Sequence, residues 1–233
     1  MKLIKKYGLF IFWGILILDC IFCLVNAKSN RIYTKTLLLP TLAIYFYINT
    51  KRGKHSTSKT FIYASLLMAW LGDLLILKND LRTNDFFLAF GFTALITAFS
   101  IYGLMFKRMF PIKIKDCQEA FLGFVSIIVV CGVFYSFLNS LDLLNFKLPI
   151  ISGMIIMCVV MAFATNLIKD KVRNNMAVQF FVPGIIILSL SLGILIASRF
   201  LLKEADFLPA VIMLTYGYGQ MLVIRGFTKY LKA

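Results

Sequence analysis

The amino-acid sequence predicts an all-α, polytopic membrane protein: a bundle of eight transmembrane helices. Hydrophobic residues make up 61% of the 233 residues and charged residues only 15%, whereas soluble domains are about 45–50% apolar and about 25% charged. The apolar residues gather in stretches of roughly 20, the length that crosses a bilayer as a helix. The short alternating segments of a β-barrel are not found. An ordinary cytosolic enzyme, a disordered chain and a disulfide scaffold are therefore excluded.

Eight apolar stretches follow one another along the chain, each bounded by charged or turn residues. They cover residues 7–25, 34–49, 61–77, 86–106, 120–138, 148–168, 178–200 and 207–224. The second is short and contains Pro40, which predicts a kink or a tilt. Eight spans use about 160 residues, so the loops are short and residues 1–233 form a single integral membrane domain.

The first stretch is interpreted as a retained helix rather than a cleaved signal peptide. It follows Lys2, Lys5 and Lys6 as a signal peptide does, but it is about 19 residues long, against about 7–15 for a signal sequence. It also contains Asp19. A helix that carries a carboxyl group at this depth is more typical of a transmembrane bundle.

The distribution of basic residues predicts the orientation. With a cytoplasmic N-terminus, 17 of the 25 basic residues fall on the cytoplasmic side, as the positive-inside rule requires. We therefore expect an integral membrane protein, in a bacterial inner membrane, with the N-terminus and C-terminus cytoplasmic. Much of the net charge of +15 then matches anionic membrane lipids as partners rather than nucleic acid. The oligomeric state is left open.

No metal site and no cofactor are expected. Cys20 and Cys23 form a Cys-x-x-Cys pair inside an apolar helix, but without nearby histidine they are better interpreted as packing residues. The single histidine, His55, lies in a basic loop. Phosphate-binding loops, dinucleotide fingerprints and the common hydrolase motifs are all missing from the sequence.

Two acids lie within the apolar stretches, Asp19 and Asp73. Charged groups inside a membrane are costly and usually face the bundle interior. Asp73 is a candidate proton donor, because apolar surroundings favour a neutral carboxyl group; a structural pair with Lys35 is the alternative. Lys35 and Arg199 could share an outer-half cavity with both acids, or could extend to the interface.

Weaker candidates are polar side chains inside other spans, which often contact only a neighbouring helix. They are Tyr102, Ser189, Ser191, Tyr216 and Gln220. A faint internal repeat relates residues 71–77 (LGDLLIL) to 191–196 (SLGILI), with Asp206 matching Asp85. A parallel 4+4 duplication is therefore possible.

These pieces, taken in order, resemble the YhhN-like membrane family, the lysoplasmalogenases. The matching segments are 35–38 (KTLL), 72–75 (GDLL), 87–92 (FLAFGF) continuing to Tyr102, the helix from Gly184 to Phe200, and 215–220 (TYGYGQ). The resemblance covers nearly the whole chain. It departs at two positions, because the second family aspartate falls on Leu192 and the family histidine falls on Phe99.

The resemblance implies hydrolysis of the vinyl ether bond of a lysoplasmalogen, with a lipid substrate and acid/base chemistry. Asp73 and Asp19 are then the catalytic candidates, and the residues that contact the substrate are Lys35, Tyr102, Ser189, Ser191, Arg199, Tyr216 and Gln220. Two alternatives stay open. A catalytically impaired lipid-binding protein on the same scaffold would explain the lost acid and histidine, and a transporter would need only eight helices and a repeat.

Overall fold

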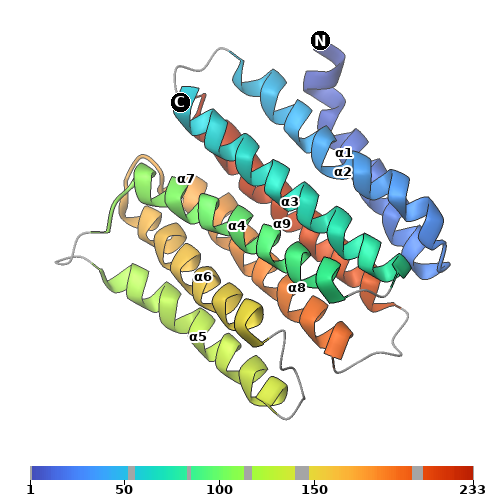
Figure 1. Cartoon of the computed structure of the whole chain (residues 1–233). Helices are drawn as coiled ribbons and strands as arrows, with labels where there is room; N and C mark the ends of the chain where they lie inside the picture. Colours follow the sequence, from blue (N-terminus) through green and yellow to red (C-terminus); the bar gives the residue numbers. More distant parts are fainter. Residues whose placement is uncertain are drawn as a thin grey trace.

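The structure, a computed structural model, describes residues 2–51, 56–82, 85–112, 117–139, 147–200 and 207–232, and every regular element in these ranges is helical. The long helices are α1 (Lys2–Leu24), α2 (Lys28–Thr50), α3 (Ser56–Arg82), α4 (Asp85–Met109), α5 (Gln118–Asn139), α6 (Lys147–Asn166), α8 (Val182–Phe200) and α9 (Leu208–Tyr230). Figure 1 shows them as one bundle. The predicted all-α membrane bundle is confirmed.

Shorter helical turns join α6 to α8. They are η2 (Leu167–Lys169), α7 (Asn174–Met176) and the π-helical segment η3 (Ala177–Phe181). Because Pro183 follows η3 in the first turn of α8 and cannot donate a backbone hydrogen bond, a locally rearranged hydrogen-bond ladder is expected here. The seventh predicted span therefore corresponds to η3 and α8 together.

Five helices in the described ranges are long and apolar enough to cross a membrane. These segments are Tyr7–Leu24, Thr57–Lys78, Phe86–Met109, Leu148–Lys169 and Asn174–Arg199. Their outward faces carry large apolar side chains, such as Phe10 and Leu148, which are 72% and 81% exposed. Such a surface suits contact with lipid rather than with water.

The helices pack as antiparallel hairpins, most extensively α3 on α4 and α8 on α9, followed by α1 on α2 and α5 on α6. Helix α9 also contacts α1 and α2, and α4 contacts α6. The two chain ends lie at the same end of the bundle (Figure 1). This pairing is compatible with a 4+4 repeat, which stays a prediction; Asp206, and the basic loop residues at 52–54, 113, 115 and 203, lie outside the described residues.

Two pairs of glycines allow the closest helix approaches. A Cβ atom on Gly72 would lie 3.0 Å from the carbonyl oxygen of Gly91, and one on Gly91 would lie 3.1 Å from that of Gly72. Gly184 and Gly219 are related in the same way between α8 and α9, at 3.3 and 3.1 Å. Small residues at such crossings let membrane helices pack backbone to backbone. The α3–α4 contact fixes the position of Asp73, the next residue after Gly72.

The turn from α1 to α2 is tight, and Asn26 makes it possible. Asn26 has a φ of 53°, a left-handed conformation that asparagine tolerates better than most residues. The amide of Ala27 donates to the carbonyl of Phe22, and that of Asn26 to Cys23, the pattern that ends many helices. This turn brings the last turns of α1 opposite the first turns of α2.

Helix α2 is longer than the sequence predicted. It runs for 23 residues from Lys28 and includes Pro40, so the helix extends beyond the short apolar stretch 34–49, and a kink or tilt at Pro40 stays a prediction. Pro40 has no backbone N–H, which leaves the carbonyl of Thr36 without its usual helical partner. The indole nitrogen of Trp70 on α3 donates to that carbonyl at 3.1 Å. The two helices are therefore joined at the point where the helical ladder is interrupted.

Replacing Trp70 by phenylalanine is expected to lower the free energy of unfolding by about 1 kcal/mol, because a half-buried carbonyl loses its donor. In a Pro40→Ala background the backbone amide of residue 40 can donate to the Thr36 carbonyl. Replacing Trp70 by phenylalanine should then lower the free energy of unfolding much less. Unfolding of the four proteins of this double-mutant cycle in mixed micelles measures the difference. Equal costs in the two backgrounds would contradict the assigned hydrogen bond.

Candidate functional site

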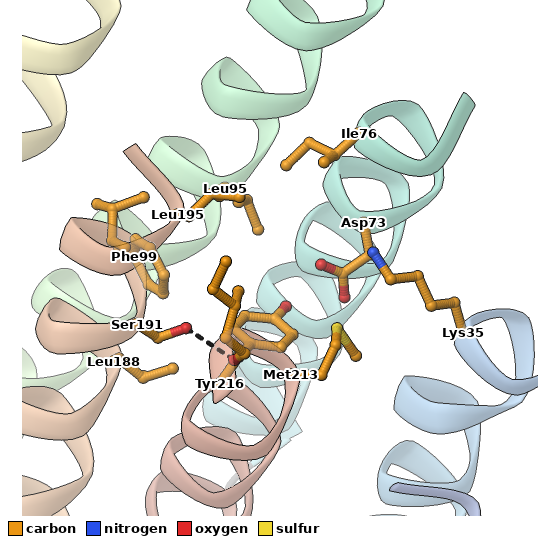
Figure 2. Close-up of a pocket in the computed structure, with 12 residues that line it drawn as sticks. Lys35, Asp73, Ile76, Leu95, Phe99, Leu188, Ser191, Leu195, Met213 and Tyr216 are labelled. Atoms are coloured by element: carbon orange, nitrogen blue, oxygen red, sulfur yellow. Dashed lines mark hydrogen bonds between the residues drawn. The ribbon is translucent and has the colours of Figure 1, made fainter. Parts of the chain in front are cut away.

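A small cavity lies inside the bundle between α3, α4, α8 and α9, with one residue from α2 (Figure 2). Its lining is Lys35, Asp73, Ile76, Leu95, Phe99, Leu188, Ser191, Leu192, Leu195, Ile212, Met213 and Tyr216. The centres of water molecules can occupy about 40 Å³ of it. At roughly 10–15 Å³ for each molecule, it has room for a few waters but not for a lipid headgroup.

Asp73 and Lys35 meet at this cavity. The two residues are 7% and 6% exposed, and Figure 2 shows the Lys35 side chain reaching from α2 toward the Asp73 carboxyl group. Of the four charged residues that the sequence suggested could share a cavity, Lys35 and Asp73 line it, whereas Asp19 and Arg199 do not.

A row of buried polar groups continues from the cavity into the bundle core. Tyr216 lies beside both Asp73 and Gln220, and the Tyr102 hydroxyl donates to the Gln220 side-chain oxygen at 2.7 Å. Among the described residues, the Tyr216 hydroxyl and the Gln220 amide nitrogen have no hydrogen-bond partner. Buried polar groups rarely stay unsatisfied. The two atoms are thus a natural site for a bound water or a polar substrate atom.

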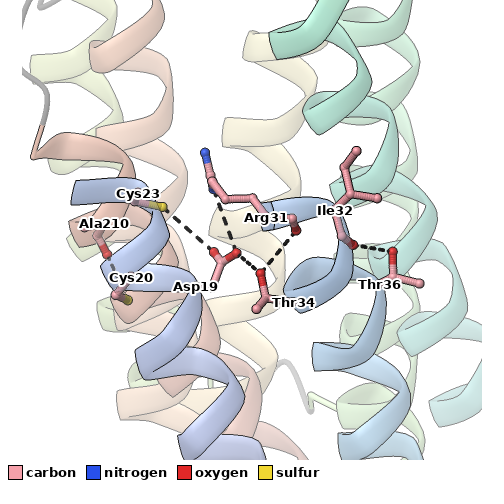
Figure 3. A network of polar contacts seen from close by, with 8 residues as sticks. All are labelled: Asp19, Cys20, Cys23, Arg31, Ile32, Thr34, Thr36 and Ala210. Atoms are coloured by element: carbon pink, nitrogen blue, oxygen red, sulfur yellow. Dashed lines mark hydrogen bonds and ion pairs between the residues drawn. The ribbon is translucent and has the colours of Figure 1, made fainter. Parts of the chain in front are cut away.

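Asp19 is completely buried but is held by α2 rather than by the cavity (Figure 3). Its carboxylate accepts a hydrogen bond from the Thr34 hydroxyl at 2.5 Å and lies 3.8 Å from the Nε of Arg31. The Cys23 thiol is 3.9 Å from its second oxygen. Asp19 does not line the cavity, so its contacts favour a structural role over direct catalysis.

The remaining predicted residues divide into two groups. Ser191 lines the cavity, and its hydroxyl donates to the Ile212 carbonyl at 3.1 Å (Figure 2). Ser189 donates to the Ile185 carbonyl in its own helix at 2.8 Å and does not line the cavity. Arg199, at the end of α8, does not line it either. Contacts of Ser189 and Arg199 with a substrate remain predictions.

Leu192 and Phe99, the positions of the two expected departures, both line the cavity with Asp73. This placement makes their identity important, because an acid or a histidine at either position would stand beside Asp73. The present side chains supply neither a proton acceptor nor a charge. The assignment of the family aspartate and histidine to these two positions stays a prediction.

Two residues of the site were missed by the sequence reasoning, Arg31 and Thr34. In the predicted orientation Arg31 is one of the eight basic residues outside the cytoplasmic side, yet it is 7% exposed. A signal did exist, because Arg31 precedes Lys35 by four residues and therefore shares its helix face. Thr34 carries no comparable signal, since threonines in membrane helices usually bond to their own backbone.

No group of three His, Cys, Asp or Glu side chains that could hold a metal ion occurs in the described part of the chain. The Cys20 thiol points to the Ala210 carbonyl at 3.6 Å, and Cys23 packs in the core near Asp19. Both contacts agree with the packing interpretation of the pair.

The fold and the cavity define an integral membrane helical bundle with an acid and a lysine buried between its helices. Comparison with protein families gives a match to the model of the YhhN family over residues 30–227. The chain belongs to the YhhN family. Neither curated proteins nor solved structures give a match.

Proposed function

We propose that this protein hydrolyses the vinyl ether bond of lysoplasmalogen-type lysolipids, with Asp73 as the proton donor. The observation that carries this proposal is a carboxyl group buried beside a water-sized cavity within a membrane domain. The YhhN family includes lysoplasmalogenases. A lipid substrate explains why the polar site lies between transmembrane helices, where a lysolipid dissolved in the bilayer can reach it.

The first step of the hydrolysis requires an acid. The Asp73 carboxyl group gives its proton to the outer carbon of the vinyl ether, and the double-bond electrons form the new C–H bond. The carbon next to the ether oxygen becomes an oxocarbenium ion, as in glycoside hydrolysis. The Asp73 carboxylate that remains stabilises this positive charge through space. Lys35 also stabilises this carboxylate until water adds to the substrate.

The second step requires a water molecule. A water molecule adds to the oxocarbenium carbon and returns its proton to the Asp73 carboxylate, which gives a hemiacetal. The hemiacetal then breaks into a fatty aldehyde and the free glycerol hydroxyl of the headgroup fragment. The unpartnered atoms of Tyr216 and Gln220 suit the holding of this water. One carboxyl group can thus act as acid and then as base.

An apolar groove gives the alkenyl chain a path to this site. The groove lies between α2 and α3 and is lined by Pro40, Ala43, Tyr63, Leu67 and Trp70 among others. Trp70 stands one helical turn before Asp73 along α3. The chain of a lysolipid that lies in this groove brings its vinyl ether to the level of the acid.

A specific observation favours a second candidate, a lipid-binding protein without catalytic activity. The cavity that Asp73 lines also carries Leu192 and Phe99, and the second buried acid, Asp19, is engaged by Thr34 and Arg31. The Lys35–Asp73 pair would then be a structural element of a binding site. This candidate predicts binding of the same lipids without turnover.

Aldehyde release from purified protein separates the two candidates. We expect release from a vinyl-ether lysophospholipid and none from the saturated alkyl-ether analogue of equal chain length, because only the vinyl ether forms an oxocarbenium ion on protonation. An aldehyde-trapping reagent followed by mass spectrometry measures the product. If the vinyl-ether lipid binds but releases no aldehyde, the lipid-binding candidate is correct.

The orientation is part of the proposal. We place both termini in the cytoplasm of a bacterial inner membrane, which is supported by the 17 basic residues on that side. The cavity then lies in the outer half of the bilayer, about two helical turns from the α1–α2 turn.

A further inference from the structure

A groove between the first turns of α3 and the last turns of α4 combines positive charge with apolar walls. It has a volume of about 560 Å³, within the range of about 300–1,000 Å³ that is typical of ligand sites. Its lining is Thr57, Phe61, Leu104, Lys107, Arg108 and Pro111. None of these residues lines the Asp73 cavity, and Phe61 lies about 18 Å before Asp73 along α3. The groove is therefore separate from the candidate active site.

The order of the lining residues along the two helices fits the depth of a lipid. Thr57 begins one apolar span, and Lys107 and Arg108 lie in the last turn of another. These three residues are thus at the level where the hydrocarbon of a bilayer meets the headgroups, whereas Phe61 and Leu104 lie one helical turn further in. Both chain ends lie at this end of the bundle (Figure 1), which is the cytoplasmic side in the proposed orientation.

Lys107 and Arg108 bring two positive charges to the groove. Both are exposed, and no acid in the described parts of the chain forms an ion pair with either of them. The Arg108 guanidinium lies over the ring of Phe61, with 5.0 Å between its central carbon and the ring centroid. This contact holds the cation at the wall of the groove. A guanidinium has five N–H donors, so it can bind phosphate oxygens at the same time.

Positive charge at the end of a span can also arise from topology alone. Lys51 and Lys171 are exposed cations at the same end of the bundle, and neither lines this groove. Lys107 and Arg108 differ from them because an apolar recess lies directly beneath the two charges. A soluble anion would gain nothing from that recess, whereas an acyl chain would be removed from water there. The combination favours a ligand that carries a negative headgroup on an apolar chain.

We propose that this groove binds an anionic diacyl phospholipid of the surrounding bilayer. The phosphate lies between Lys107 and Arg108, and the first part of one acyl chain lies against Phe61 and Leu104. Basic pockets between transmembrane helices bind anionic headgroups in this way. A zwitterionic lipid gains less, because its headgroup also carries a positive charge that the two cations repel. The bound lipid joins the ends of α3 and α4, and the inference does not depend on the proposed hydrolysis.

Lipid binding to the purified full-length protein tests this site. The probes are dioleoyl phosphatidylglycerol, dioleoyl phosphatidylcholine and glycerophosphoglycerol, which is the anionic headgroup without its chains. Each is titrated into the protein in a neutral detergent at an ionic strength of about 0.15 M. We expect the wild type to bind phosphatidylglycerol at least about tenfold more tightly than phosphatidylcholine. Glycerophosphoglycerol should bind much more weakly than either lipid, because it has no chain for the apolar recess.

The test variant removes both cations of the groove, Lys107→Gln together with Arg108→Gln. The matched control, Lys51→Gln together with Lys171→Gln, removes the same charge from the same end of the bundle. All four side chains are exposed, so both double variants should fold. We expect the test variant to bind the two lipids within about twofold of each other. The control should keep at least about half of the wild-type preference, because it loses only a screened, long-range attraction.

Three results would overturn the lipid site: equal binding of the two lipids by the wild type, an equal loss of preference in both double variants, or binding of glycerophosphoglycerol as tight as that of phosphatidylglycerol. The second result would assign the preference to overall surface charge, and the third to a soluble anion. If the test variant does not fold, Lys107→Gln and Arg108→Gln are measured singly, and each should lose part of the preference. Neither lipid contains a vinyl ether, so these results are independent of aldehyde release.

Discussion

Replacement of Asp73 by asparagine is expected to reduce vinyl-ether cleavage by at least about 10²-fold, the contribution of a positioned general acid. Asparagine has nearly the same shape as aspartic acid but has no acidic proton to give to carbon. Among the described residues that line the cavity, Asp73 is the only acid, so no other side chain of this lining can replace it. Aldehyde release measured over time, with wild type and variant at equal concentration, gives the ratio.

The control for this prediction is Asp170→Asn. Asp170 forms an ion pair with Arg173 at 2.7 Å in the connection between α6 and α8, far along the bundle from the cavity. The same chemical change there should leave the cleavage rate within about twofold of the wild type. Unchanged activity in Asp73→Asn would remove Asp73 from the mechanism, whatever the behaviour of the control.

The helices could be predicted because the lipid environment strongly restricts which residues a membrane-spanning helix can contain. Each span requires an uninterrupted apolar stretch, and the eight stretches found in the sequence match the observed helices. Their ends could not be predicted, because helices continue past the apolar zone. The first turns of α2 are the clearest case: Arg31 and Thr34 are polar, yet Asp19 of α1 compensates them inside the bundle.

The sequence predicted at which level of the membrane the site residues lie, but not toward which neighbour each helix turns them. Sequence position gives the level of a residue in the membrane, so the acids and Lys35 were expected at similar levels. Which face of a helix turns toward which neighbour depends on packing, and the Gly72–Gly91 crossing sets this for α3. Ser191 and Ser189 show the result: they are two residues apart, and only Ser191 lines the cavity.

A second acid in the cavity is expected to increase cleavage. We predict that Leu192→Asp raises the rate of aldehyde release by about tenfold or more, because two neighbouring carboxyl groups divide the roles of acid and base. One carboxyl group keeps its proton when both cannot be ionised together, and the other is free to activate water. The new acid should also lower the free energy of unfolding by about 1–3 kcal/mol through the burial of a polar group.

Leu192→Asn is the matched control, because it introduces a polar side chain of the same size without an acid. A rise in rate for Leu192→Asp that Leu192→Asn does not share assigns the effect to the carboxyl group. If both variants stay at the wild-type rate, Leu192 does not face the reacting bond and the proposed substrate position is wrong. If the wild type has no activity and Leu192→Asp acquires it, the native protein is the lipid-binding protein without catalytic activity. One added carboxyl group would then be enough to turn its scaffold into a hydrolase.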